Sequence, residues 1–251
     1  MRVLILAAGM GKRLMPLTRD VPKCMVMYKN KALIDYLLEV FQSLEVDKIA
    51  LVGGYKFEVL QEFTQGRIDC FYENKNFDST NMVSTLFCAK EFLEQCIRDS
   101  QDVLISYADI IFTKKVLFKM MEYKGDVGVG INTKWRLLWE KRFANPLDDA
   151  ETLKIMQGKI KEIGKKPKSY EEIEGQYMGL FKISHQFLPV FMEFYTMLDS
   201  QKIYDGKDFA NMYMTSFLQQ IIDRFDNIEP IFIDGGWREI DSIEDLNIDE
   251  E

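Results

Sequence analysis

Residues 2–23 read RVLILAAGMGKRLMPLTRDVPK. The apolar run at residues 2–6 predicts a buried strand, and it is followed by small residues, Gly9 and Gly11, and the cations Lys12 and Arg13. Glycine lets the backbone approach a ligand closely, and backbone N–H groups beside fixed positive charge favour phosphate oxygens. The stretch therefore predicts a polyphosphate site at the end of the first strand.

Two common phosphate-binding motifs do not fit this stretch. The dinucleotide fingerprint needs a third glycine where Leu14 stands, after Gly9 and Gly11. The P-loop needs a Gly-Lys-Ser/Thr at a spacing that is missing here. An oxidoreductase built on a dinucleotide-binding core is therefore disfavoured.

Charge and composition narrow the class of partner. The chain has 251 residues, of which 47% are hydrophobic, enough for one sizeable core. Its formal net charge of −8 disfavours a nucleic-acid partner, because the chain as a whole repels a phosphate backbone. Residues 12–23 nevertheless carry four cations and one acid, and this local excess fits a small polyanion held in a cleft.

Targeting signals are not apparent. No apolar run approaches the roughly 20 residues that span a bilayer, and the first strand begins too early to leave room for a signal peptide. The four cysteines show no metal-binding spacing and are expected to be reduced. We expect a cytoplasmic protein without a membrane partner, and either a monomer or a homodimer.

Strand-like runs alternate with helix-like periodicity in the first half of the chain. The runs lie at residues 3–7, 48–52, 69–72, 103–106 and 127–131. Apolar faces at helical spacing lie at residues 33–44, 59–63, 82–93 and 116–121, with Ser79 or Thr80 as a cap for the third and Thr113 for the fourth. The alternation predicts an α/β fold, a Rossmann-like and mostly parallel sheet flanked by helices.

The pattern changes near residue 133. Residues 135–146 are aromatic and basic without clear periodicity. Further strands are expected at 160–163, 177–183 and 231–233, and helices from Ser184 to about residue 198 and over 209–225, with a capping box at Ser242 and Asp245. We expect a single domain, residues 1–251, with a nucleotide-binding half (1–132) and an acceptor half (133–251) that carries a small lid lobe.

The string from Leu6 to Lys23, Leu-Ala-Ala-Gly-x-Gly-x-Arg-Leu-x-Pro-Leu-Thr-x-x-x-Pro-Lys, resembles the N-terminal motif of the nucleotidyltransferases that act on phosphorylated sugars and alcohols. Residues 105–111, 135–136, 145–151 and 161–165 resemble the branch of cytidylyltransferases for phosphocholine, phosphonates or phosphoglutamine. The resemblance implies a GT-A-like fold, CTP and a small phosphorylated or phosphonate acceptor as substrates, release of pyrophosphate, and a role in modifying cell-surface polysaccharide such as a capsule.

Within that resemblance, Arg13 and Lys23 are the candidate catalytic residues. Arg13 can bind two oxygens of the triphosphate, and Lys23 can place a point charge on the α-phosphate or on the incoming phosphate. Asn81 and Ser84 face the nucleobase in similar enzymes, although capping of the following helix is an equally good interpretation. The candidate nucleotide-binding residues are Leu6, Ala7, Ala8, Gly9, Gly11, Lys12, Arg13, Gly54, Asn81, Ser84 and Tyr107.

Asp109 and Asp241 are the candidate metal ligands. Asp109 follows the strand at residues 103–106, at the end where a parallel sheet opens its ligand crevice. Mg²⁺ takes oxygen ligands and commonly only one or two protein carboxylates, and matching aspartates hold the metal in the resembled family. The alternative is that both are turn or cap residues. With Mg²⁺ as cofactor and an acceptor phosphate ionised near neutral pH, in-line displacement needs no general base and no covalent intermediate.

The acceptor side is less defined by sequence. Lys166 resembles a lysine that holds the acceptor phosphate, and the cluster around Trp135 and Arg142 could bind an ammonium or an anion or simply pack as a lid. His185, the single histidine, is expected to have no catalytic role, which argues against a histidine-based triad. The candidate acceptor-binding residues are Lys23, Trp135, Arg142, Lys166, Tyr177 and Trp237.

Two alternative functions stay open at this point. A hexose-1-phosphate uridylyl- or thymidylyltransferase would share the N-terminal motif, although sugar hydroxyls usually require several polar side chains. A regulatory module that binds a nucleotide without turnover would be expected to lack Arg13 or a metal ligand.

Overall fold

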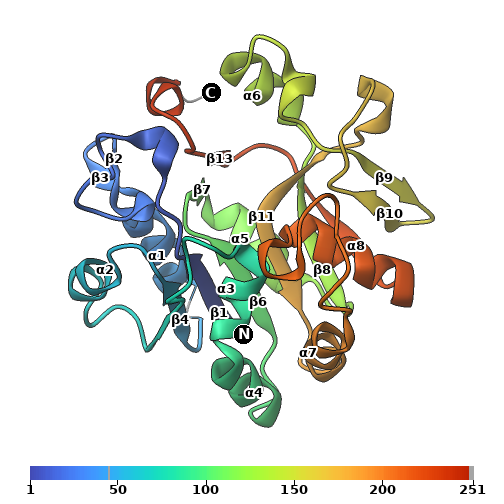
Figure 1. Cartoon of the computed structure of the whole chain (residues 1–251), viewed down its shortest axis with the longest axis horizontal. Helices are drawn as coiled ribbons and strands as arrows, with labels where there is room; N and C mark the ends of the chain where they lie inside the picture. Colours follow the sequence, from blue (N-terminus) through green and yellow to red (C-terminus); the bar gives the residue numbers. More distant parts are fainter. Residues whose placement is uncertain (45, 249–251) are drawn as a thin grey trace.

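The computed structural model describes residues 1–44 and 46–248. Its centre is a seven-stranded sheet with the order β12-β8-β11-β6-β1-β4-β5. Neighbouring strands are parallel except β11, which runs antiparallel to both β6 and β8 (Figure 1). In this spatial order the strands span Ile228–Ile233, Val127–Asn132, Gln176–Ile183, Val103–Tyr107, Arg2–Ala7, Ile49–Gly53 and Cys70–Glu73.

Helices cover both faces of this sheet. They are α1 (Leu33–Ser43), α2 (Phe57–Phe63), α3 (Met82–Cys88), α4 (Lys90–Arg98), α5 (Lys114–Glu122), α6 (Trp135–Arg142), α7 (Leu188–Met197) and α8 (Met214–Phe225). Along β1, Leu4 and Leu6 join one buried cluster, whereas Val3 and Ile5 join another. Because successive side chains of a strand point to opposite faces, this continuous apolar strand is buried on both sides.

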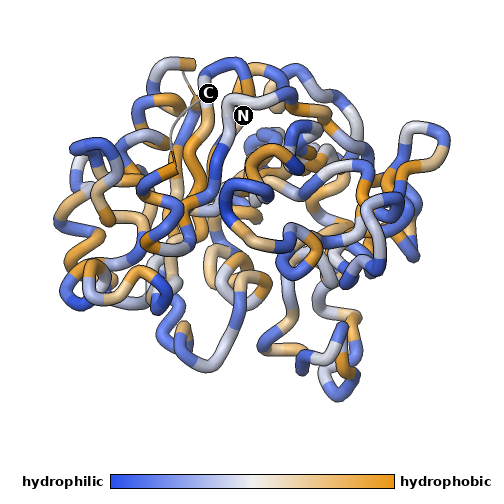
Figure 2. Tube along the Cα trace, turned by 90° about the horizontal axis from the view of Figure 1, so that it is seen from above, coloured by the Kyte–Doolittle hydropathy of each residue, from blue (hydrophilic) through white to orange (hydrophobic). Residues whose placement is uncertain are grey.

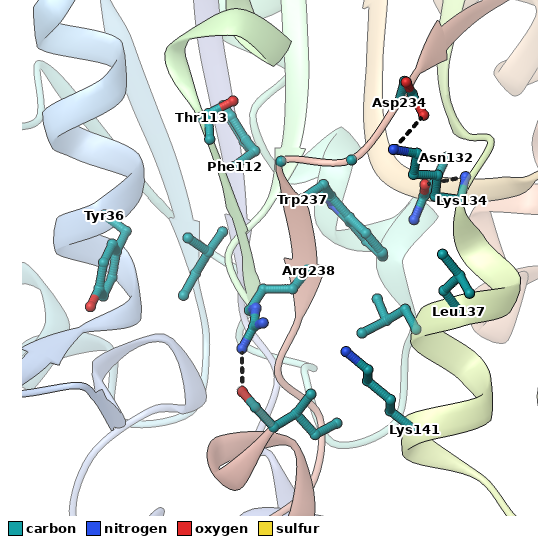
Figure 3. A pocket seen from close by; sticks show the side chains of 15 residues that line it. Tyr36, Phe112, Thr113, Asn132, Lys134, Leu137, Lys141, Asp234, Trp237 and Arg238 are labelled. Carbon is teal, nitrogen blue, oxygen red and sulfur yellow. Dashed lines mark hydrogen bonds and ion pairs between the residues drawn. The ribbon is translucent and has the colours of Figure 1, made fainter. Parts of the chain in front are cut away.

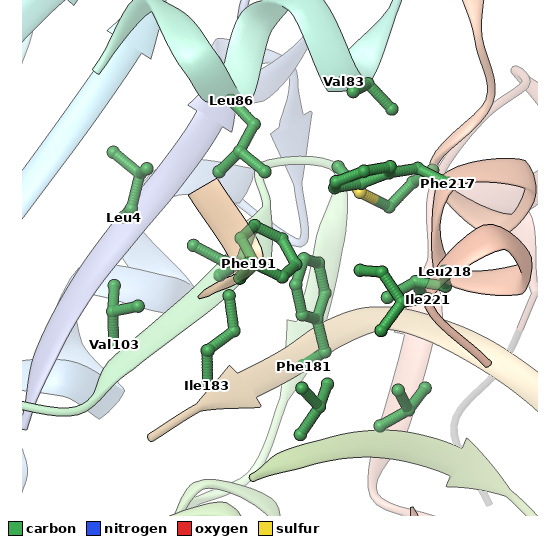
Figure 4. Close-up of a cluster of buried hydrophobic side chains, with 14 of the residues drawn as sticks. Leu4, Val83, Leu86, Val103, Phe181, Ile183, Phe191, Phe217, Leu218 and Ile221 are labelled. Carbon is green, nitrogen blue, oxygen red and sulfur yellow. The ribbon is translucent and has the colours of Figure 1, made fainter. Parts of the chain in front are cut away.

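The first cluster joins strands of both halves of the chain to helices of both halves. Figure 4 shows Leu4 and Val103 on one side of it, with Phe191 of α7 and Phe217 of α8 packed over Phe181 of β11. In the tube of Figure 2, hydrophobic stretches run through the interior and hydrophilic stretches mark many of the outer loops. No helix in the described part of the chain is long and apolar enough to cross a bilayer.

Three short antiparallel pairs lie outside the main sheet. They are β2–β3 (Met27–Tyr28 and Lys31–Ala32), β9–β10 (Leu153–Met156 and Lys159–Ile163) and β7–β13 (Ile110–Phe112 and Trp237–Glu239). In the last pair Glu239 lies opposite Ile110, and the N–H of Ile240 donates to the carbonyl of Asp109 at 2.9 Å. This pairing brings Asp241, near the end of the chain, to the carboxyl end of β6.

The predicted strands are confirmed with bounds that shift by a few residues at most. The predicted helix over 82–93 is divided at Ala89 into α3 and α4, and its cap is Asn81, whose side chain accepts from the N–H of Met82, so the expectation of Ser79 or Thr80 was wrong. Residues 135–142, in which the sequence showed no clear periodicity, form α6, and its buried residues are Trp135 and Trp139, one helical turn apart. The predicted helix at 209–225 begins instead with a short 3₁₀ turn, Phe209–Asn211.

Three other helix starts were predicted; Thr113 is the N-cap of α5 but makes no side-chain capping hydrogen bond. Ser184 Oγ accepts from the N–H of Phe187, just ahead of α7. The capping box is confirmed, since the N–H of Ser242 donates to the carboxylate of Asp245 at 2.8 Å and the N–H of Asp245 to Ser242 Oγ at 3.4 Å. It opens a final 3₁₀ turn, Glu244–Asn247.

Candidate active site

The loop after β1 is shaped by Gly11. Its φ of +64° starts the 3₁₀ turn Lys12–Leu14, and its carbonyl accepts from Thr18 Oγ1 at 3.0 Å. A Cβ at this position would stand 2.8 Å from the Cβ of Lys23, so glycine is required both for the backbone angle and for the packing. The backbone of Gly9 faces open space, and the side chains of Lys12 and Arg13 are exposed. The loop thus presents backbone and two cations to a ligand.

The ends of β1 and β4 meet beside this loop. The N–H of Tyr55 donates to the carbonyl of Ala8 at 3.1 Å, and a Cβ on Gly54 would come within 2.9 Å of the Ala8 side chain. Leu6 and Ala7 are buried in the two core clusters. These predicted nucleotide residues therefore lie together, and Leu6, Ala7 and Ala8 are all buried.

Lys23 lies between the two predicted metal ligands. Its Nζ is 2.6 Å from Asp109 Oδ2 and 2.6 Å from Asp241 Oδ1. Arg13 also pairs with Asp241. Burial alone would lower the pKa of Lys23, but the two carboxylates raise it well above the usual lysine value. Burial likewise works against ionisation of Asp241, yet Lys23 holds the pKa of this carboxyl below its usual range.

This pair of carboxylates fits a magnesium ion that is completed by its substrate. Asp109 Oδ1 is buried and has no hydrogen-bond partner. Within residues 1–44 and 46–248, no group of three or more His, Cys, Asp or Glu side chains is placed to hold a metal. Mg²⁺ is usually held by one or two carboxylates together with substrate phosphates and water. The arrangement therefore suits an ion that arrives with a phosphorylated substrate rather than a permanent structural metal.

A cavity of about 340 Å³ is lined by Asp241, whereas Asp109 and Lys23 are not among its lining residues. Its volume is in the range of small-molecule sites. Among the described residues that line it, acidic side chains outnumber basic ones, with one cation, Arg13, against four carboxylates. The lining includes Arg13, Asn81, Tyr107, Trp139, Asp149, Glu151, Gln176, Tyr177, Gly179, Tyr213, Trp237, Glu239 and Asp241.

Two of these carboxyl groups have strongly perturbed acidities. Burial, reinforced by Asp149 and Glu239, raises the pKa of Glu151 to about 7. Burial and the nearby Asp109 raise the pKa of Glu239 to about 7, although Arg142 opposes the shift. Gln176 accepts from the N–H of Glu151 at 2.9 Å and donates to its carbonyl, so this residue is held at a fixed point of the wall. Perturbed carboxyl groups that share a cleft mark functional sites.

Aromatic side chains form a further part of the wall. The rings of Trp139 and Trp237 are stacked with centroids 6.4 Å apart, and their Nε1 atoms donate to Asp149 Oδ2 at 3.1 Å and to the carbonyl of Met178 at 3.0 Å. Tyr107 and Tyr177 meet edge to face at 5.9 Å. Aromatic rings with carboxylates among them suit a ligand group that is positively charged.

Several predicted site residues do not reach this cavity. The Arg142 side chain is 3% exposed and binds Glu239 and Asp245, so its role here is to hold the segment that carries Asp241. Lys166 donates to the carbonyls of Leu147 and Asp148. Trp135 is buried against Trp139 and Tyr170, as a lid that packs its own aromatics would be.

The two residues predicted to contact the nucleobase, Asn81 and Ser84, have different surroundings. Ser84 Oγ donates to the carbonyl of Ala210, whereas Asn81 caps α3 and also lines the cavity. His185 pairs with Asp102 at the amino end of β6, the end opposite Asp109. Asp149, Glu151 and Tyr213 of the cavity wall were not among the predicted residues, because single acids and a tyrosine in loops give no distinctive spacing.

A larger cavity of about 650 Å³ lies on the other side of Trp237 (Figure 3). Figure 3 shows Tyr36, Leu137 and Lys141 around it, with Lys134 paired to Asp234. None of the predicted metal ligands lines this cavity, so the smaller one is the candidate site despite its size.

Comparison with known proteins decides the family. The sequence profile of the MobA-like NTP transferase domain matches residues 3–154. The chain belongs to this family. It is 51% identical over 99% of its length to a CTP:phosphoglutamine cytidylyltransferase of Campylobacter jejuni subsp. jejuni serotype O:2, of which it covers 98%. It is also 31% identical to a choline-phosphate cytidylyltransferase of Streptococcus pneumoniae, over 41% of this chain and 46% of that protein.

Solved structures agree with the fold. The inositol-1-phosphate CTP transferase from T. maritima superposes with a TM-score of 0.73 at 20% identity, covering 98% of this chain and 91% of that one. The CTP:phosphocholine cytidylyltransferase from Streptococcus pneumoniae gives 0.70 at 19% identity, with 97% and 95% covered. The nucleotidyltransferase fold and family expected from the N-terminal motif are thus confirmed.

Proposed function

We propose that this member of the MobA-like NTP transferase family is a cytidylyltransferase, which transfers CMP from CTP to a small phosphorylated acceptor and releases pyrophosphate. The observation that carries the proposal is the meeting of Lys23 and Arg13 with Asp109 and Asp241 at the edge of the phosphate loop. The 51% identity to a CTP:phosphoglutamine cytidylyltransferase over nearly the whole chain supports the choice of nucleotide.

The reaction is a phosphoryl substitution for which the site supplies charge and position. An oxygen of the acceptor phosphate forms a bond to the α-phosphorus of CTP, and the bond from that phosphorus to the β-phosphate oxygen breaks, so that pyrophosphate leaves with the electron pair. Mg²⁺, held by Asp109 and Asp241, would supply Lewis-acid stabilisation of the phosphate charge. Arg13 neutralises charge that builds on the leaving group, and Lys23 orients the reacting phosphates.

The cavity wall favours an acceptor that carries a cation as well as a phosphate. An ammonium group placed near Glu151 and Asp149 would gain charge-assisted hydrogen bonds, and the ring of Tyr177 on the same wall would favour the same charge. A hexose phosphate offers no such cation. We therefore propose phosphoglutamine, which bears an α-ammonium group, as the acceptor, and a product destined for cell-surface polysaccharide.

The test is a substrate matrix. CTP, UTP, dTTP and ATP are each incubated with Mg²⁺ and with phosphoglutamine, phosphocholine, 2-aminoethylphosphonate or glucose 1-phosphate, while pyrophosphate release is followed and products are identified by mass. We expect the highest kcat/KM for CTP with phosphoglutamine. Preferred turnover of UTP or dTTP with the hexose phosphate would replace the proposal by the sugar nucleotidyltransferase alternative, and tight CTP binding with no turnover would favour a regulatory module.

A further inference from the structure

Lys23 occupies the space that a divalent ion needs. Its ammonium lies 2.6 Å from one oxygen of each of Asp109 and Asp241, and its side chain is only 13% exposed. A cation that bridges both carboxylates satisfies them electrostatically and keeps them from repelling each other. A second cation cannot enter between the same oxygens while the ammonium is there.

We propose that the Lys23 ammonium holds the place of the divalent ion between the two carboxylates until nucleotide binds, and that the ion enters only together with the nucleotide, whose phosphates receive the displaced ammonium. This inference rests on the proposed function and specifies the order in which metal and nucleotide bind. Lys23 thereby serves first as a substitute for the metal and then as a phosphate ligand. Metal and nucleotide each bind weakly alone and strongly as a pair.

The surroundings of Lys23 support an exchange of this kind. A buried ammonium that loses its carboxylate partners is strongly destabilised unless another anion replaces them. A phosphate bound at the loop can replace them, because Gly11 lies directly against the base of the Lys23 side chain. Lysine is a flexible point charge that can swing between two anions without changing its backbone.

Arg13 cannot play the same part. It also pairs with Asp241, but its side chain is 68% exposed, so it can leave the carboxylate for water at little cost. It does not contact Asp109, whose second oxygen stays without a partner. The barrier to metal entry therefore lies with Lys23.

Binding of Mn²⁺, followed by the electron paramagnetic resonance signal of the free ion, tests the proposal without any turnover. Without nucleotide we expect Mn²⁺ to bind Lys23→Gln about tenfold or more tightly than the wild type, because the buried ion-paired cation no longer has to be displaced. The matched control is Lys31→Gln, since Lys31 pairs with Glu39 on the surface and should leave the Mn²⁺ affinity as in the wild type. Equal or weaker binding by Lys23→Gln would overturn the proposal.

Thermal stability provides a second readout if Lys23→Gln is poorly folded. Its two facing carboxylates should lower Tm in the absence of metal, and Mg²⁺ alone should restore much of the loss. The wild type should respond to Mg²⁺ only when CTP is present. If Mg²⁺ alone shifts Tm equally in both proteins, the ammonium is not an obstacle and the inference fails. Failure of the proposed function looks different: no acceptor is turned over, whereas the metal affinities still differ between the two proteins.

Discussion

Replacing Glu151 by glutamine should weaken binding of an ammonium-bearing acceptor without slowing the chemical step. Glutamine keeps the volume of the side chain, and both hydrogen bonds between Gln176 and the backbone of residue 151 remain. What is lost is the negative charge. A hydrogen bond to a charged group contributes about 1.5 to 3 kcal/mol, which corresponds to a rise of about 10- to 150-fold in KM for the acceptor.

The same carboxylate should make the acceptor KM depend on pH. The pKa of Glu151 is raised to about 7, so the carboxylate is ionised above that pH and is neutral below it. The KM of the wild type for phosphoglutamine should therefore rise as the pH falls through 7, whereas the KM of Glu151→Gln should change much less. Steady-state kinetics between pH 6 and 8.5, with CTP saturating, measure both curves.

Two results for the acceptor KM would contradict this prediction. If Glu151→Gln has the wild-type KM at pH 8, or if both proteins share one pH profile, the carboxylate does not contact the acceptor. The control is Glu140→Gln, since Glu140 lies on the exposed face of α6 and pairs with Arg136. Its acceptor KM should match the wild type throughout. The KM for CTP should be unchanged in both variants.

Four further outcomes follow from the same structure. Arg13→Ala should lower kcat by about 10²- to 10³-fold, because it removes a charge that acts on the leaving pyrophosphate, and circular dichroism should show an intact fold. Asp109→Asn, or wild-type enzyme treated with EDTA, should lose nearly all turnover. Added Mg²⁺ should restore the activity of the EDTA-treated wild type only. Full activity in EDTA would show that the reaction needs no metal. Trp237→Ala should lower the free energy of unfolding in urea by about 3 to 5 kcal/mol, because the ring is buried and its Nε1 is bonded to the carbonyl of Met178. The pKa of Glu151 in the folded protein is raised above the ordinary 4.5, so the folded state binds one more proton than the unfolded state between pH 4.5 and 7. The stability of the wild type should therefore fall as the pH rises through that window. The Tm of Glu151→Gln should match that of the wild type near pH 4.5 and exceed it at pH 8.

The sequence was informative where local chemistry repeats over several residues. Continuous apolar runs located the strands, since a strand buried on both faces needs no alternation. The pair Ser242 and Asp245 located the last turn, because the two residues satisfy each other's backbone N–H groups. The break between α3 and α4 at Ala89 carries no glycine or proline and could not be seen in the pattern.

The site was predictable only where its residues share one stretch of chain. Gly11, Arg13 and Lys23 stand in a single motif, whereas Glu151 and Asp149 reach the cavity through tertiary packing. Arg142 shows the opposite error: a cation near aromatics suggested a ligand contact, but Asp245 and Glu239 already neutralise it. The cytoplasmic location, the oligomeric state and the role in polysaccharide modification depend on nothing that packing displays, and they stay predictions.

The pairing of β13 with β7 separates the integrity of the carboxylate pair from the integrity of the sheet. The seven-stranded sheet is complete once β12 ends at Ile233, but Asp241 comes later and is held by a strand of three residues. The framework strands therefore do not include the segment that carries Asp241. A nick in the Gly235-Gly236 connection would leave all seven strands on one chain and detach Asp241 from them, so the carboxylate pair would be lost before the sheet.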